Sequence, residues 1–284
     1  MVSGTVPAAT GERELARLQR QPQPYPWWLR LLGVILFAAG FAPSAQATWH
    51  ELLSSLILGA IMGVLFIGVE HTPRLRPLLP IVGPIVIGTV AFKVLHAHLA
   101  PGGPVIVMIP ALFVLIPGDF LCAATVEIAV GQITPGAVRL AQAAFTLVEL
   151  AAGVAIAADI SHVGARSLFE SSVHPSLPSW LVALSWIPFS LGLVWTFSAR
   201  MRDLIWILLF VYLPWGTQLA GTKLAGPVAG TFIAGTVLAL AAGLLARSPS
   251  RPPRIVVILG GFFALTVGAL ALRGLAVIDG GQHV

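Results

Sequence analysis

The chain alternates long apolar segments with short polar ones. A hydrocarbon core of about 30 Å is crossed by roughly 20 helical residues, and the apolar segments reach this length. The pattern predicts nine spanning helices, at approximately 28–47, 51–70, 78–98, 104–121, 136–158, 179–198, 203–220, 224–246 and 254–278. We therefore expect an all-α polytopic integral membrane protein.

One apolar segment is interrupted by Pro117, Gly118 and Asp119. Pro117 lacks a backbone donor and Gly118 lacks a side chain, so a spanning helix breaks there. Unpaired backbone groups cost several kcal/mol in hydrocarbon, so irregular backbone is tolerated only where protein or water satisfies those groups. We expect the break to lie inside the protein, with Asp119 directly beside it.

The next apolar segment carries a stripe of polar side chains. Their spacing is three, four and three residues, which places them within roughly one quadrant of a helix at about 100° per residue. The stripe consists of Arg139, Gln142, Thr146 and Glu149, and Gly153 falls on the same face. A polar stripe on a spanning helix is expected to face the interior of the bundle. The pattern indicates the wall of a transport pathway.

Composition excludes an ordinary soluble domain, because 57% of the residues are hydrophobic, only 10% are charged and the mean hydropathy is +0.93. The net charge of +5 comes from short basic clusters between apolar segments, which is a topology signal and not a nucleic-acid footprint. With a cytoplasmic N-terminus, twelve basic residues lie inside and four outside. The bias predicts a cytoplasmic N-terminus and an outside C-terminus.

A longer polar connection at residues 159–178 is interpreted as a linker between two unequal halves. The predicted organisation is a cytoplasmic tail (1–27), a five-helix half (28–158), the linker, a four-helix half (179–278) and a C-terminal tail (279–284).

Three acidic residues in or beside the spanning segments are candidate proton carriers: Asp119, Glu127 and Glu149. Desolvation favours the protonated form of a buried carboxyl group, which proton coupling requires. Each also has a structural interpretation, as a partner of Arg139 or as a charge at a helix end. Arg139 could bind a carboxylate of a substrate or of Glu127, or anchor the cytoplasmic end of its helix.

Other chemistry is not indicated. His96 and His98 are two residues apart and would point to different helix faces, so no metal site is expected. No serine–histidine–acid order and no phosphate-binding loop is recognisable, so we expect neither an enzyme nor a cofactor.

From Pro117 onward, small and charged residues follow one ungapped pattern: Pro117, Gly118, Ala124, Glu127, Gly131, Gly136, Arg139 and Ala143. This pattern resembles that of the threonine/serine exporter family. The similarity extends upstream through Gly33 and Gly40, and Pro253 to Gly274 looks like the family's second-half motif. Three positions depart from the pattern: Ala123 stands for an Asn, Glu127 for an Asp and Val267 for a Pro.

The resemblance implies export of a small neutral amino acid by proton antiport in the cell inner membrane. Lipid, the amino acid and protons are then the expected partners, and a homo-oligomer remains open. Together with the break and the polar stripe, the resemblance gives as candidate gate and pathway residues Pro117, Gly118, Asp119, Glu127, Gly131, Arg139, Gln142, Thr146 and Glu149, with Gly268, Arg273 and Gly274 in the second half. The alternative is a transport-incompetent relative with a structural or partner-binding role.

Overall fold

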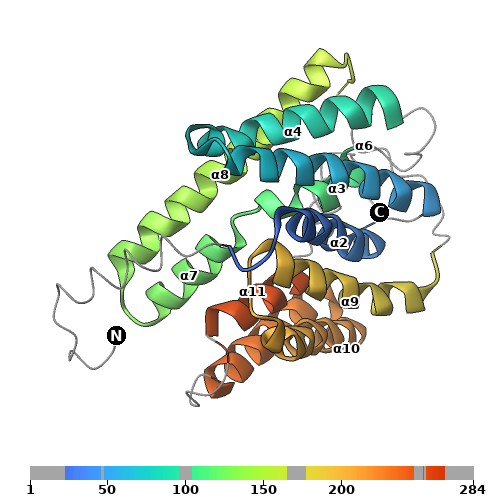
Figure 1. Cartoon of the computed structure of the whole chain (residues 1–284). Helices are drawn as coiled ribbons and strands as arrows, with labels where there is room; N and C mark the ends of the chain where they lie inside the picture. Colours follow the sequence, from blue (N-terminus) through green and yellow to red (C-terminus); the bar gives the residue numbers. More distant parts are fainter. Residues whose placement is uncertain are drawn as a thin grey trace.

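The computed structural model describes residues 23–45, 48–95, 104–164, 177–245, 252 and 254–265. Every regular element within these ranges is helical, which confirms the all-α prediction. The main helices are α2 (Trp27–Ala45), α3 (Trp49–Glu70), α4 (Leu79–Val90), α6 (Pro104–Leu112), α7 (Gly118–Ala129), α8 (Ile133–Ile160), α9 (Ser179–Thr196), α10 (Leu204–Leu245) and α11 (Arg254–Leu265) (Figure 1). The short ones are η1 (Pro73–Leu78), the π-helical η2 (Ala91–Leu95), η3 (Phe113–Leu115) and η5 (Met201–Asp203).

The predicted count of nine spans is not confirmed. Within the described residues, six helical segments are long and apolar enough to cross a membrane, and a seventh is added if the bent pair formed by α6 with η3 and α7 is one span. Segments of α9 and α11 are apolar but shorter. Of the last predicted span, 254–278, only the part up to Leu265 is described.

α10 contains two of these spans, joined by a sharp break at Gly226. Gly226 has φ 87° and ψ 169°, a conformation that side chains other than glycine rarely adopt. The chain folds back there. A hydrogen bond across the break shows this: Gln218 Nε2 donates to Thr231 Oγ1 at 3.0 Å. The predicted boundary between spans 203–220 and 224–246 therefore lies close to the observed one.

The segments on either side of the predicted linker pack directly together through α2 and α9. The two backbones approach so closely that a Cβ atom on Gly33 would lie 2.8 Å from Trp195 Cβ. Gly40 meets the backbone of Phe189 in the same way, and Gly192 meets that of Phe37. Small residues at these crossings allow the dispersion contacts that hold membrane helices together.

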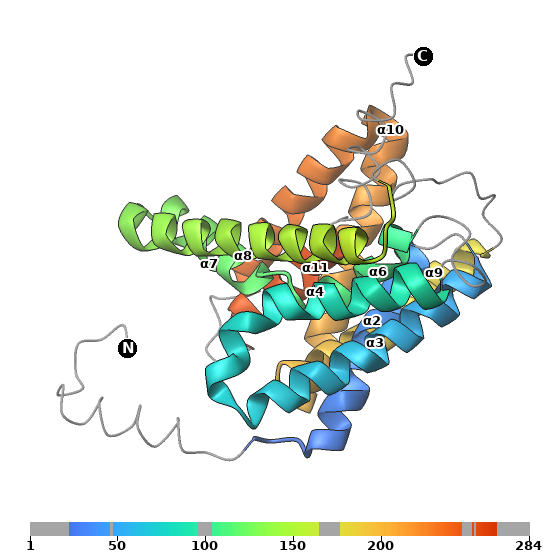
Figure 2. The same ribbon diagram turned by 90° about the horizontal axis from the view of Figure 1, so that it is seen from above.

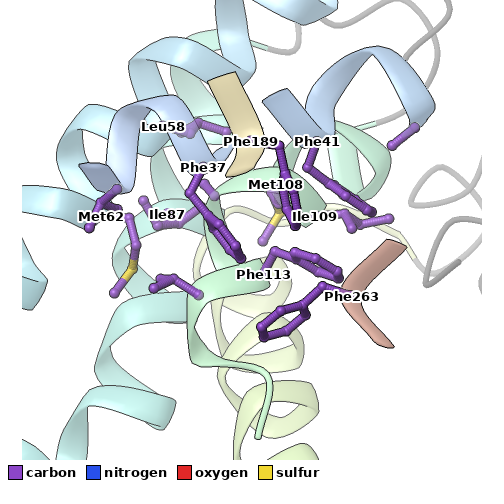
Figure 3. Close-up of a cluster of buried hydrophobic side chains, with 14 of the residues drawn as sticks. Phe37, Phe41, Leu58, Met62, Ile87, Met108, Ile109, Phe113, Phe189 and Phe263 are labelled. Carbon is purple, nitrogen blue, oxygen red and sulfur yellow. The ribbon is translucent and has the colours of Figure 1, made fainter. Parts of the chain in front are cut away.

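An aromatic cluster at the centre joins four elements (Figure 3). Phe41 of α2 stacks on Phe113 of η3 with ring centroids 3.9 Å apart, and Phe37 stacks on Phe189 of α9 at 4.8 Å. Phe263 of α11 lies 5.0 Å from Phe113 and 5.4 Å from Phe37. The turn of chain that immediately precedes Pro117 is therefore anchored in the core.

Two contacts fasten the predicted cytoplasmic end. Arg30 of α2 forms an ion pair with Glu70 at the end of α3. The Tyr25 hydroxyl donates a hydrogen bond to Ala199 O at 2.8 Å. Burial, and to a smaller extent the neighbouring Asp203 carboxylate, raises the pKa of Tyr25. These contacts bring the starts of α2 and α10 to the same end of the bundle as the end of α3.

α7 and the first half of α8 lie side by side and project from the rest of the bundle (Figure 2). The second half of α8 packs on α4, where a Cβ atom on Gly88 would lie 2.5 Å from Ala157 Cβ. The first half of α8 packs against α7. α8 is thus held to the bundle at one end and to its hairpin partner at the other.

Candidate functional site

The predicted break is present at Ile116 and Pro117, where the helical segment formed by α6 and η3 meets α7 at a bend of 61°. Ile116 has ψ 126°, the extended conformation that a following proline favours. The Gly118 N–H bonds to Ile116 O at 2.7 Å, and the Leu121 N–H bonds to Pro117 O at 3.0 Å as α7 begins. The backbone groups freed by the break are partly satisfied by these local bonds.

The break faces protein, as expected from the cost of exposing it to lipid. Pro117 and Gly118 are buried. A Cβ atom on Gly118 would lie 2.9 Å from Phe263 Cε1 and 3.5 Å from Leu259 Cδ1, both on α11. Asp119, one residue further on, is exposed.

The family-like residues after the break build a tight helical hairpin. Gly131 has φ +84° in the turn between α7 and α8, where a residue with a side chain is strained. Gly136 lets α8 approach α7, since its Cβ atom would lie 2.6 Å from Ile128 Cγ1 and 3.1 Å from Ala124 O. Ala124 is itself buried. Three of the motif's small residues are therefore explained by packing and by the turn.

An ion pair closes the hairpin. Arg139 Nε donates to both carboxylate oxygens of Glu127, at 2.9 and 3.0 Å. The Arg139 side chain is 44% exposed and that of Glu127 is 20% exposed. Of the interpretations left open by the sequence, the structure realises the pairing of Arg139 with Glu127.

The polar stripe does not face the bundle interior along its whole length, which corrects the expectation from spacing. Arg139 and Gln142 are exposed, and Thr146 and Glu149 are partly buried. Only Gly153 is fully enclosed, with its Cβ position 2.6 Å from Ile81 O on α4. The reason is length: the 28 residues of α8 span about 42 Å, and only the second half reaches α4.

The three candidate carboxyl groups are not gathered at one point. Asp119 and Glu127 are eight residues apart on α7, about 12 Å along its axis. Glu149 is on α8, and within the described ranges it has no hydrogen bond or ion pair. Gly268, Arg273 and Gly274 of the second-half motif, and His96 and His98, lie outside the described residues.

Sequence reasoning missed the burial of Glu51, which is only 1% exposed. Glu51 and Thr48 form a capping box at the start of α3, in which the Thr48 N–H donates to Glu51 Oε2 at 2.9 Å. The signal was available as Thr-x-x-Glu ahead of an apolar segment. The capping signal places Glu51 at a helix start, but it does not show that α6 packs over that start and buries the carboxyl group.

Several membrane-length helices, packed around a buried helix break, define a multi-pass membrane protein. Comparison with known families gives a match to the ThrE family of threonine/serine exporters over residues 1–161, more than half of the 284-residue chain. The chain belongs to this family, a family of membrane transporters. No curated protein and no solved structure matches it. The matched part ends one residue after α8, so it contains the break and the hairpin.

Proposed function

We propose that the protein exports small neutral amino acids of the threonine/serine type by proton antiport. The observation that carries this proposal is the family match over residues 1–161, since that range holds the break at Pro117 and the α7–α8 hairpin. The setting we propose is the cell inner membrane, with the N-terminus in the cytoplasm and the C-terminus outside.

The break at Pro117 and Gly118 is the proposed gate. Few backbone hydrogen bonds join η3 to α7, so the two can change their angle without unwinding a continuous helix. The contact of Gly118 with Phe263 couples such a change to α11. A hinge of this kind, buried between two parts of the molecule, fits alternating access.

Proton coupling needs a carboxyl group that is charged in one state and neutral in another. Glu149 is the proposed carrier on α8, because it is partly buried and has no ion-pair partner among the described residues. Glu127 is a second candidate: its protonation would release Arg139 to bind the carboxylate of an amino acid.

The direct test is efflux of labelled serine and threonine from loaded cells with and without the protein. The proposal predicts faster efflux with the protein, and loss of the concentrative component when an uncoupler removes the proton gradient. Efflux that is the same with and without the protein, for both amino acids, would contradict it.

A second candidate is a structural or partner-binding role without transport. Ala123 favours this candidate, because the family pattern carries an amide there, and so does the ion pair that already occupies Arg139. Purification of the protein under mild conditions with a stoichiometric membrane partner, together with no efflux, would support it.

A further inference from the structure

Glu51 is the most deeply buried acidic side chain in the described part of the chain. It is 1% exposed, while the next, Asp203, is 7% exposed. A carboxyl group inside a spanning segment is expensive to bury, so its presence there indicates a function unless a structural need explains it. The capping box is such a need, and any functional proposal has to be separated from it experimentally.

The surroundings of Glu51 are polar and lie between two helices. Ser55 follows four residues later, on the same face of α3, and its hydroxyl donates to Val107 O of α6 at 3.3 Å. Ser54 donates to His50 O at 3.1 Å, and both serines are completely buried. The Glu51 carboxyl group is therefore part of a buried polar strip at the α3–α6 contact.

The elements that pack on α3 carry few ionisable groups. α4 and α6 have none. On α2, Arg30 pairs with Glu70, which is 19 residues from Glu51 and so about 28 Å away along α3. Lys93 on η2 is exposed, as is His50 beside Glu51. Arg74 and Arg76 on η1 follow the far end of α3 and are exposed.

We propose that Glu51 is the group that takes up the driving proton from the outer side of the membrane. This inference rests on the proposed antiport and on the predicted topology, which puts the start of α3 at the outer face. Trp49, half-exposed at that start, is the type of residue found at a membrane interface. Export driven by protons requires entry from this side.

Proton uptake at Glu51 has a structural consequence. The carboxylate gains one proton and becomes a neutral acid, and it returns that proton when it ionises again. The hydrogen bond from the Thr48 N–H to Oε2 is stronger with the charged form, so uptake weakens the capping box. The first turn of α3 then loosens against α6. Helix α6 continues through η3 to the hinge at Pro117.

Glu51→Gln separates the two roles of this side chain. Glutamine also completes a capping box, with a neutral acceptor like that of the protonated acid, so the fold is kept, but it cannot take up or release a proton. In proteoliposomes, E51Q should fold with at most a small fall in melting temperature, retain serine exchange at equal pH on both sides, and lose pH-driven net efflux. The matched control is Asp159→Asn, which removes an exposed acid from the end of α8 and should change none of these.

Infrared spectroscopy supplies a measurement that needs no substrate. The wild type should show a protonated-carboxyl band that grows as the pH is lowered, and E51Q should lack that component. Wild-type pH-driven efflux in E51Q, or an identical band in both proteins, overturns the proposal and leaves Glu51 as a cap. A titrating band in a protein that exports neither serine nor threonine would refute the proposed function while proton uptake stands.

Discussion

Gly118 is the position where the structure makes the sharpest quantitative prediction. A Cβ atom there would lie 2.9 Å from Phe263 Cε1 and 3.0 Å from Phe263 Cζ, whereas carbon atoms in good contact are about 3.5–4.0 Å apart. Phe263 is 1% exposed and packs against Phe113 and Phe37, so its ring has little room to move. Even alanine should be poorly tolerated.

The expected size follows from two opposing effects. Overpacking a well-filled core costs about 1–3 kcal/mol. Replacing glycine with alanine near a helix start returns at most about 1 kcal/mol. Gly118→Ala should therefore lower the free energy of unfolding by about 1–2 kcal/mol, and Gly118→Leu should reduce folded yield or abolish transport.

The assay is the fraction of monodisperse protein that survives stepwise heating in detergent. Gly68→Ala is the matched control, because no atom lies within 4 Å of its Cβ position and it should be neutral or stabilising. Phe263→Leu in the Gly118→Ala background should recover part of the loss, since the two side chains share the same space. Gly118→Ala with the stability of the control would refute the packing argument, and wild-type efflux by Gly118→Leu would refute the gate.

Three further predictions concern the hairpin and α8. Exchanging the charges, with Glu127→Arg and Arg139→Glu together, should recover the stability lost by either single change. The partly exposed pair is worth only up to about 1 kcal/mol, so the effect is small. Heating in detergent measures it, and no recovery would mean that the pair does not hold the hairpin. Gly131→Ala should lower the free energy of unfolding by about 1–2 kcal/mol, because alanine is strained at φ +84°. Unchanged stability in the same heating assay would contradict this. Glu149→Gln should fold normally, lose pH-driven net efflux and retain exchange; unchanged pH dependence would remove Glu149 as a carrier.

The helical architecture and the break could be predicted because each has a local cause. Segment length fixes which helices can span, and Pro117 with Gly118 disrupts a helix whatever packs around it. Burial of the break followed from the cost of unpaired backbone in hydrocarbon. The predicted boundary at residues 221–223 lies a few residues before the observed break at Gly226, because segment length does not show which residue adopts a positive φ.

The direction of the polar stripe could not be predicted, because it depends on where neighbouring helices end. Spacing places Arg139 and Gln142 on one face, but it does not say that α4 covers only the second half of α8. Burial of Glu51 likewise depends on α6 lying over the start of α3. Pairing of α2 with α9 joins residues about 150 apart in the sequence, and glycine spacing alone does not name the partner helix.

Two of the three departures from the family pattern, Ala123 and Glu127, lie on one face of α7, which makes their combined effect testable. Asp119, Ala123 and Glu127 are spaced four residues apart, so they follow one side of the helix. Glutamate for aspartate at 127 keeps a carboxylate for Arg139, and the ion pair forms. Alanine for asparagine at 123 removes an amide between two acidic residues and leaves that side without its middle hydrogen-bonding group.

Ala123→Asn restores the amide at a partly buried position, where the larger side chain has an open edge. If the missing amide limits transport, A123N should raise serine and threonine efflux above the wild type with an unchanged melting temperature. Ala123→Leu controls for bulk, because it adds similar volume without hydrogen-bonding capacity and should not raise efflux. If A123N and an active wild type export equally fast, Asp119 and Glu127 serve this face without the amide. If neither protein exports, the structural role is the better account.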